Sequence, residues 1–225
     1  MMQSGGCVGC ESYAPTCQQA EACHHGGFMN YPLTFRFHLF AFSPQISVTE
    51  AGGQMLCYVK QKLFRLREKV EVYTDDTMQT LLATIEADRI IDWSARYTFR
   101  AADGRVLGAV GRQGMRSLWR AHYDVVAPGA ETPSFVIQEA NPFVKLLDGI
   151  VGEIPLLGLF TGFILHPSYI AMRGEGGPPV LKLTKQPALF EGRFGLTQEG
   201  PADEGEQLAL LLSFLMMNLL ERQRG

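Results

Sequence analysis

The segment from Leu208 to Leu220 is apolar on every side of a helix except at Ser213 and Asn218. A helix without a polar face must be surrounded by lipid or by protein. Its thirteen residues span about 20 Å at 1.5 Å each, whereas the hydrocarbon core of a bilayer is about 30 Å thick. We therefore expect the rest of the chain to enclose this helix.

Charged residues flank this apolar segment at positions that suit the two ends of a helix. Asp203 and Glu206 have the spacing of a capping box, in which each side chain accepts a hydrogen bond from the other residue's backbone N–H. Glu204 and Glu206 suit the positively polarised start of a helix, and Arg222 and Arg224 suit its negatively polarised end. The pattern predicts one helix that starts near Asp203 and ends near Arg222.

Upstream of this helix, short segments alternate between apolar and polar residues, as β-strands with one buried face do. Turn residues separate them, most clearly at 50–53, 103–104 and 174–179. About a dozen strands at even spacing are typical of a sandwich or a closed barrel. The predicted strands are 33–39, 46–48, 55–61, 64–73, 81–85, 97–100, 106–110, 119–126, 135–138, 169–173, 180–183 and 189–196.

Strands and helix together predict a mainly β (α+β) domain, a closed antiparallel barrel of about twelve strands around a central hydrophobic C-terminal helix. Closure removes exposed strand edges, and the helix fills a lumen too wide for strand side chains alone. A chain of 225 residues with 46% hydrophobic residues can bury such a core as one domain. We assign this domain to residues 29–225.

Residues 1–28 show no apolar periodicity and are predicted to be a disordered, cysteine-rich extension, with Met29 as a candidate for the true translational start. The extension contains residue types that bind zinc, but their spacing is not that of a standard finger. An unstructured tail with reactive thiols is favoured over a zinc site. The absence of a secretory signal and of a disulfide framework predicts a cytoplasmic location. The zinc candidates are Cys7, Cys10, Cys17 and Cys23, followed by His24 and His25.

Several segments carry a resemblance to a known family. They are MLCYVKQKLFRLREKVEVYTDD at 55–76, EADRIIDWSARYTFRAADGRVLGAVGRQGMRSLWRAHYDV at 86–125, HPSYIAMRGEGGPPVLKLTK at 166–185, and the terminal helix. Over residues 31–225 the chain resembles the LURP-one-related family and, more distantly, the tubby C-terminal domain and the phospholipid scramblases. The resemblance implies a twelve-stranded barrel around a hydrophobic helix. It implies no catalytic residues, because the family has no shared catalytic motif.

Basic residues gather in two segments. In a strand, Arg65, Arg67 and Lys69 lie on one face and can meet lipid phosphates, and the resemblance to tubby domains implies phosphoinositide binding. A solvated barrel exterior, partly neutralised by Glu68 and Glu71, is the competing interpretation. Candidates for lipid or phosphate binding are Lys60, Lys62, Arg65, Arg67 and Lys69; weaker candidates for anion binding are Arg112, Arg116 and Arg120.

The segment 146–170 is the part of the sequence best suited to touch a membrane. Nineteen uncharged residues lie between Glu153 and Arg173, but Pro155 and the break at 166–168 leave only 154–165 strongly apolar. That length is too short for a transmembrane helix and typical of a buried crossover or an interfacial segment. We expect no transmembrane span. Both other interpretations remain open.

Catalytic and nucleic-acid functions lack support in the sequence. The GxSxG, P-loop, HExxH and GxGxxG motifs are absent, and His38, His122 and His166 are scattered singly. The net charge of −3, with charges well mixed, gives no bulk attraction to nucleic acid. We predict a non-enzymatic binding or scaffold protein without a cofactor, peripheral to membranes, whose partner is anionic phospholipid or a membrane-associated protein. The alternative is a small-molecule carrier or an unrecognised enzyme with a site at the barrel rim.

Overall fold

The computed structural model describes residues 29–38, 45–60, 69–88, 95–112, 121–140, 168–188 and 192–222. These residues form twelve strands and one α-helix, α3 (Glu204–Arg222). The strands are β1 (Leu33–His38), β2 (Gln45–Thr49), β3 (Met55–Lys60), β4 (Lys69–Tyr73), β5 (Leu81–Ala87), β6 (Arg96–Ala101), β7 (Val106–Arg112), β8 (His122–Val126), β9 (Phe135–Glu139), β10 (Ser168–Arg173), β11 (Pro179–Gln186) and β12 (Gly192–Gln198).

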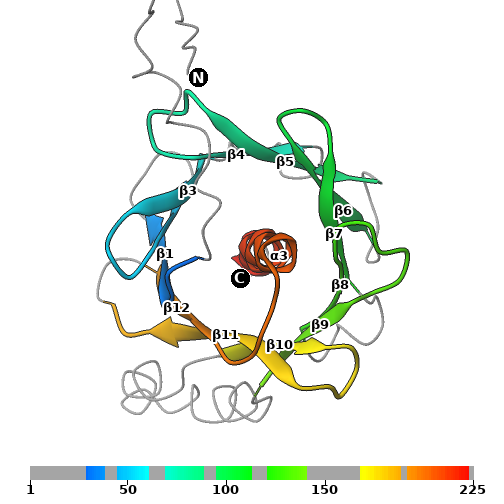
Figure 1. Cartoon of the computed structure of the whole chain (residues 1–225). Coiled ribbons are helices and arrows are strands. Elements are labelled where there is room, and N and C mark those ends of the chain that lie inside the picture. Colours follow the sequence, from blue (N-terminus) through cyan, green and yellow to red (C-terminus); the bar gives the residue numbers. More distant parts are fainter. Residues whose placement is uncertain are drawn as a thin grey trace, which may run out of the picture.

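The strands form a closed antiparallel barrel, and α3 runs through its centre (Figure 1). Each strand pairs with the next in sequence, and β1 closes the barrel by pairing with β12, where Leu33 lies opposite Leu196. Closure pairs both edges of the sheet, so none of the twelve described strands is left as an open edge. The predicted barrel around a central helix is therefore confirmed, and the sandwich alternative is wrong.

The alternation that predicted the strands also selects which side chains enter the barrel. In β1, Leu33, Phe35 and Phe37 are buried, whereas Arg36 and His38 are exposed. The described part of β4 runs from Lys69 to Tyr73, as predicted, and residues 64–68 of its predicted range lie outside the described residues. The two faces of β1 were assigned correctly because the two-residue period does not depend on where a strand begins.

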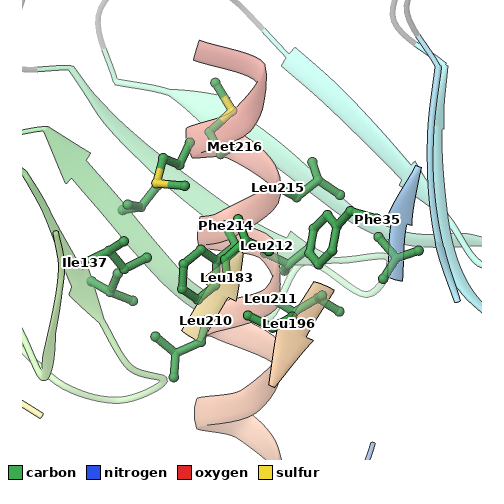
Figure 2. Close-up of a cluster of buried hydrophobic side chains, with 14 of the residues drawn as sticks. Phe35, Ile137, Leu183, Leu196, Leu210, Leu211, Leu212, Phe214, Leu215 and Met216 are labelled. Carbon is green, nitrogen blue, oxygen red and sulfur yellow. The ribbon is translucent and has the colours of Figure 1, made fainter. Parts of the chain in front are cut away.

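The apolar surface of α3 is enclosed on all sides (Figure 2). Leu210, Leu211, Phe214 and Leu215 are all fully buried, as the apolar run predicts. The barrel wall surrounds them with side chains that include Phe35, Ile137, Leu183 and Leu196. Within the described ranges, no helix combines the length and hydropathy that a bilayer crossing requires.

The two polar residues of the apolar run are satisfied within the helix itself. Ser213 Oγ donates to the carbonyl oxygen of Ala209 at 2.7 Å, and Asn218 Nδ2 donates to that of Phe214 at 2.7 Å. Hydrogen bonds to the preceding turn remove the cost of burying these groups in an apolar interior. The helix thus presents an apolar surface to the barrel wall at every turn.

Antiparallel pairing gives the barrel two different rims. At the turn rim, the described connections 50–54, 74–80, 102–105, 127–134 and 174–178 join successive strands, and 199–203 leads into α3. At the loop rim, strands end or begin next to residues outside the described ranges. Because Arg173 at the end of β10 contacts Glu206, and Tyr123 at the start of β8 contacts Glu221, α3 begins at the turn rim and ends at the loop rim.

Candidate functional site

Two members of the first predicted basic set, Lys60 and Lys69, lie at the loop rim. Lys60 ends β3 and Lys69 begins β4, and both side chains are exposed. Because these strands are neighbours in the barrel, the segment 61–68 starts and finishes on adjacent strands of one rim. Lys62, Arg65 and Arg67 belong to that segment and lie outside the described residues.

The partner of Lys69 differs from the one expected. Its Nζ lies 3.6 Å from Glu86 Oε1 on β5, and Arg100 Nε lies 3.8 Å from the other oxygen of the same carboxylate. Glu71, expected to help neutralise the basic row, instead accepts a hydrogen bond from the Tyr73 hydroxyl at 2.9 Å. Exposed ion pairs of this kind contribute about 0–1 kcal/mol, so Lys69 can exchange Glu86 for a competing anion at little cost.

The second predicted basic set is represented by Arg112, which ends β7; Arg116 and Arg120 lie outside the described residues. The Arg112 guanidinium lies 6.0 Å from the ring centre of Tyr123, a distance typical of a cation–π contact. The Tyr123 hydroxyl in turn donates to Glu221 Oε1 at 2.8 Å, at the end of α3. Arg112 therefore borders the interior at the loop rim as well as the outer surface.

Sequence analysis missed a buried polar group at the loop-rim end of the interior. Glu139 is only 4% exposed, and it pairs in register with Tyr169 of β10. Burial raises the pKa of the Tyr123 phenol, and the charge of Glu221 raises it further; the pKa of Tyr169 is raised by burial, Glu221 and Glu139. Both phenols therefore stay neutral. The parity of β9 was the available signal, because Phe135, Ile137 and Glu139 alternate onto one face.

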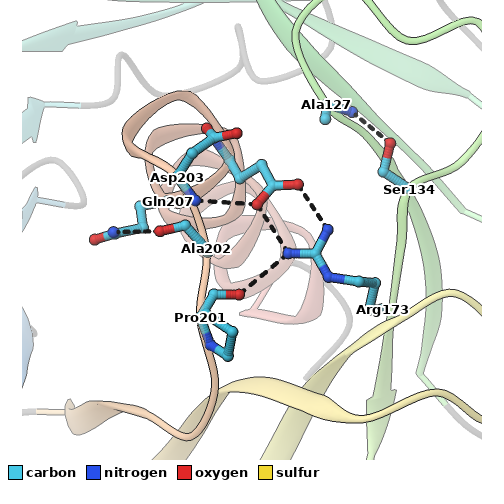
Figure 3. Close-up of polar contacts among 8 residues, drawn as sticks. Ala127, Ser134, Arg173, Pro201, Ala202, Asp203 and Gln207 are labelled. Carbon is cyan, nitrogen blue, oxygen red and sulfur yellow. Dashed lines mark hydrogen bonds and ion pairs between the residues drawn. The ribbon is translucent and has the colours of Figure 1, made fainter.

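At the turn rim, Arg173 of β10 forms an ion pair with the first turn of α3 (Figure 3). Its Nη1 and Nη2 donate to the two carboxylate oxygens of Glu206 at 2.7 and 2.9 Å, and Nη2 also donates to Pro201 O at 3.1 Å. The guanidinium lies 4.8 Å from the Phe135 ring centre. This two-point contact ties the helix to the barrel wall.

The predicted capping box is confirmed. Asp203 Oδ1 accepts from the Glu206 backbone N–H at 2.8 Å, and Glu206 Oε2 accepts from the Asp203 N–H at 3.1 Å. The hydrogen bonds from Arg173 are the main reason that the Glu206 pKa is lowered, with the Asp203 backbone and the charge of Arg173 adding to the effect. Asp203 and Glu206 thus serve helix capping, and Glu206 also attaches α3 to the barrel wall.

We expect Glu206→Gln to lower the free energy of unfolding at neutral pH by about 1–2 kcal/mol, because a charge-assisted pair becomes a neutral hydrogen bond. A carboxyl group with a lowered folded-state pKa stabilises the fold above its unfolded pKa, near 4.5, and loses that contribution as the pH falls. Denaturant titrations of wild type and variant should therefore converge on acidification. Glu204→Gln, an exposed change in the same helical turn, is the control. A difference that stays constant down to pH 3 would contradict the role of the ionised carboxylate.

The other titratable candidates give no catalytic arrangement among the described residues. His38 is exposed at the end of β1, His122 Nε2 lies 3.9 Å from Asp124 Oδ1, and His166 lies outside the described ranges. Burial raises the pKa of the Cys57 thiol to about 12, which keeps it protonated and unreactive. In the described part of the chain, no three His, Cys, Asp or Glu side chains gather as metal ligands. The candidate zinc cysteines all precede residue 29, outside that part.

Fold and surface define a class of protein: a closed twelve-stranded antiparallel barrel filled by its own helix, with basic residues at one rim. No family model matches the chain, and no curated protein matches it. Among solved structures, the chain is similar to a protein of Arabidopsis thaliana determined by X-ray crystallography, with 15% sequence identity and a TM-score of 0.49. The match covers 88% of this chain and 94% of the Arabidopsis chain.

Proposed function

We propose that this chain is a LURP-one-related, tubby-like barrel protein, related to the phospholipid scramblases, which acts as a non-enzymatic binding or scaffold protein. Its proposed ligand is anionic phospholipid, and its proposed place is the cytoplasmic surface of a membrane. The sequence resemblance and the barrel architecture support the family. The position of Lys60 and Lys69 supports the ligand, since both are exposed at the points where the basic segment 61–68 leaves and rejoins the barrel.

The chemistry of these side chains suits a lipid headgroup. A lysine or arginine near an anionic membrane gains about 1 kcal/mol, so a few such contacts give reversible binding. The single described partner of Lys69 is an exposed glutamate, which a phosphate can replace at little cost. Binding of this kind needs no internal cavity, which agrees with a lumen occupied by α3.

The alternative function, a carrier or an enzyme with a site at the barrel rim, draws support from one observation. Glu139, Tyr169 and Tyr123 place buried polar groups at the loop-rim end of an otherwise apolar interior. A carrier that used the centre of the barrel would have to displace side chains such as Leu211 and Phe214, which are packed there. A small ligand would therefore have to bind at the rim, beside Glu139.

The test is the triple reversal Arg65→Glu, Arg67→Glu, Lys69→Glu, measured by flotation with anionic vesicles. At about 1 kcal/mol per contact, loss of three contacts should weaken binding at least a hundredfold and leave the unfolding midpoint unchanged. Binding of the wild type should fade as salt shortens the Debye length. Wild-type protein that stays unbound with every anionic lipid at low salt would reject the lipid proposal and leave a protein-binding scaffold.

A further inference from the structure

The described charges are separated along the barrel axis. The turn rim, together with the first turn of α3, has ten acidic residues and three basic ones, Arg100, Arg105 and Arg173. This end of the molecule is therefore strongly negative. The acidic residues are Glu50, Asp75, Asp76, Asp103, Glu131, Glu175, Glu199, Asp203, Glu204 and Glu206.

The loop rim has the opposite sign. Six basic residues lie in the first or last two positions of its strands: Lys60, Lys69, Arg96, Arg112, Lys185 and Arg193. Two acidic residues, Glu86 and Glu139, lie in the same positions; Asp88 directly follows β5, and Glu221 lies beside this rim at the end of α3. Glu86 pairs with Lys69, Asp88 accepts the Arg96 backbone N–H at 2.9 Å, and Glu139 lies inside the barrel. At the described strand ends of this rim, the six basic residues therefore outnumber the carboxylates beside them.

Net charge alone cannot bring the molecule to an anionic membrane. The chain has a net charge of −3, so an averaged charge would be repelled. The two rims are separated by the length of α3, whose 19 residues span about 28 Å, whereas the Debye length at 0.1 M salt is about 10 Å. When the loop rim faces the membrane, salt screens the acidic turn rim from the lipid headgroups. When the barrel lies on its side, both rims are within a Debye length of the headgroups, and repulsion by the acidic residues dominates.

The basic residues are also spread around the rim. They come from β3 and β4, from β6 and β7, and from β11 and β12, which are three separate arcs of the barrel (Figure 1). A compact acidic peptide can meet only one arc at a time. A flat anionic surface can meet all three, so this distribution favours a membrane over an acidic protein.

We propose that the barrel binds an anionic phospholipid membrane end-on, through its loop rim. The end of α3 then points toward the lipid, and the turn rim points toward the solvent. This inference rests on the proposed lipid-binding function and adds the orientation and the contacting residues to it. Lys60, Arg96 and Lys185 are its most direct contacts, because each is exposed and each lies on a different arc.

The test compares two variants with the same change in net charge, using phosphatidylcholine vesicles with and without phosphatidylserine. The rim variant is Lys60→Glu, Arg96→Glu, Lys185→Glu. The control reverses two wall residues and one turn-rim residue: Arg36→Glu, Lys182→Glu, Arg105→Glu. We expect the rim variant to bind at least a hundredfold more weakly and the control less than threefold more weakly. Alanine versions of the three rim residues replace the reversals if the reversed variant does not show the wild-type circular dichroism spectrum.

The outcomes separate the orientation from the function. Wild-type protein that binds no phosphatidylserine vesicle would overturn both. Wild-type binding that both variants weaken equally would keep the lipid function and overturn the end-on orientation. Soluble polyglutamate is the third probe: if it binds the wild type as tightly as the vesicles do and loses the same affinity with the rim variant, the rim binds an acidic protein, and the membrane proposal is overturned.

Discussion

Leu211→Asp should yield no soluble, folded protein. Leu211 is 1% exposed and lies at the centre of the barrel, where the surrounding side chains are apolar. An unpaired charge there costs several kcal/mol, and the lost leucine packing adds about 2–5 kcal/mol. The sum approaches the whole unfolding free energy of a domain, about 5–15 kcal/mol. Soluble yield and near-ultraviolet circular dichroism measure the result.

Val106→Asp is the matched control, because it places the same charge on a side chain that is 45% exposed on β7. This variant should express and unfold much like the wild type, since its carboxylate stays in water. If Leu211→Asp were equally soluble and unfolded at the wild-type midpoint, α3 would have to lie outside the barrel in solution.

Gly108→Val should lower the unfolding free energy by about 4 kcal/mol. Gly108 has a φ of +134°, which side chains rarely adopt, and a Cβ there would lie 2.7 Å from Val126 O and 3.0 Å from Ala209 Cβ. Backbone strain of about 1–3 kcal/mol and overpacking of about 1–3 kcal/mol add together. Thermal and denaturant unfolding of the variant measure the loss.

Gly111→Val tests the same substitution in the same strand without the clash. A Cβ at Gly111 meets nothing within 4 Å, and its φ is outside the left-handed region. This variant should be neutral or slightly stabilising, because valine is favoured in strands. Equal destabilisation at both positions would show that a general preference of β7 for glycine is responsible, and not the approach of α3 at Ala209.

The fold could be predicted because its two strongest determinants are local patterns. The apolar run from Leu208 to Leu220 requires enclosure, and the two-residue period of segments such as 33–38 assigns one face to the interior. The capping box was predictable for the same reason, since Asp203 and Glu206 are three residues apart. Periodicity and short spacing can be recognised in the sequence without knowledge of the tertiary structure.

The candidate site was predictable only in part, because its contacts join residues that are distant in sequence. Lys69 pairs with Glu86 through the register of β4 and β5, although the sequence pointed to Glu68 and Glu71 as the residues that partly neutralise the basic row. The partner of Arg173, Glu206, is 33 residues away. The separation of charge between the rims also depends on the antiparallel order of the strands, which brings alternate connections to the same end of the barrel.

The order of the elements along the chain has a consequence for biosynthesis. Because α3 follows all twelve strands, a ribosome delivers the complete wall before the segment that fills it. The inner faces of the strands are exposed to water until α3 emerges, and β1 lacks its neighbour β12 until β12 emerges. Open edges and exposed apolar faces promote self-association, so we expect the nascent polypeptide to be most prone to aggregation before α3 emerges.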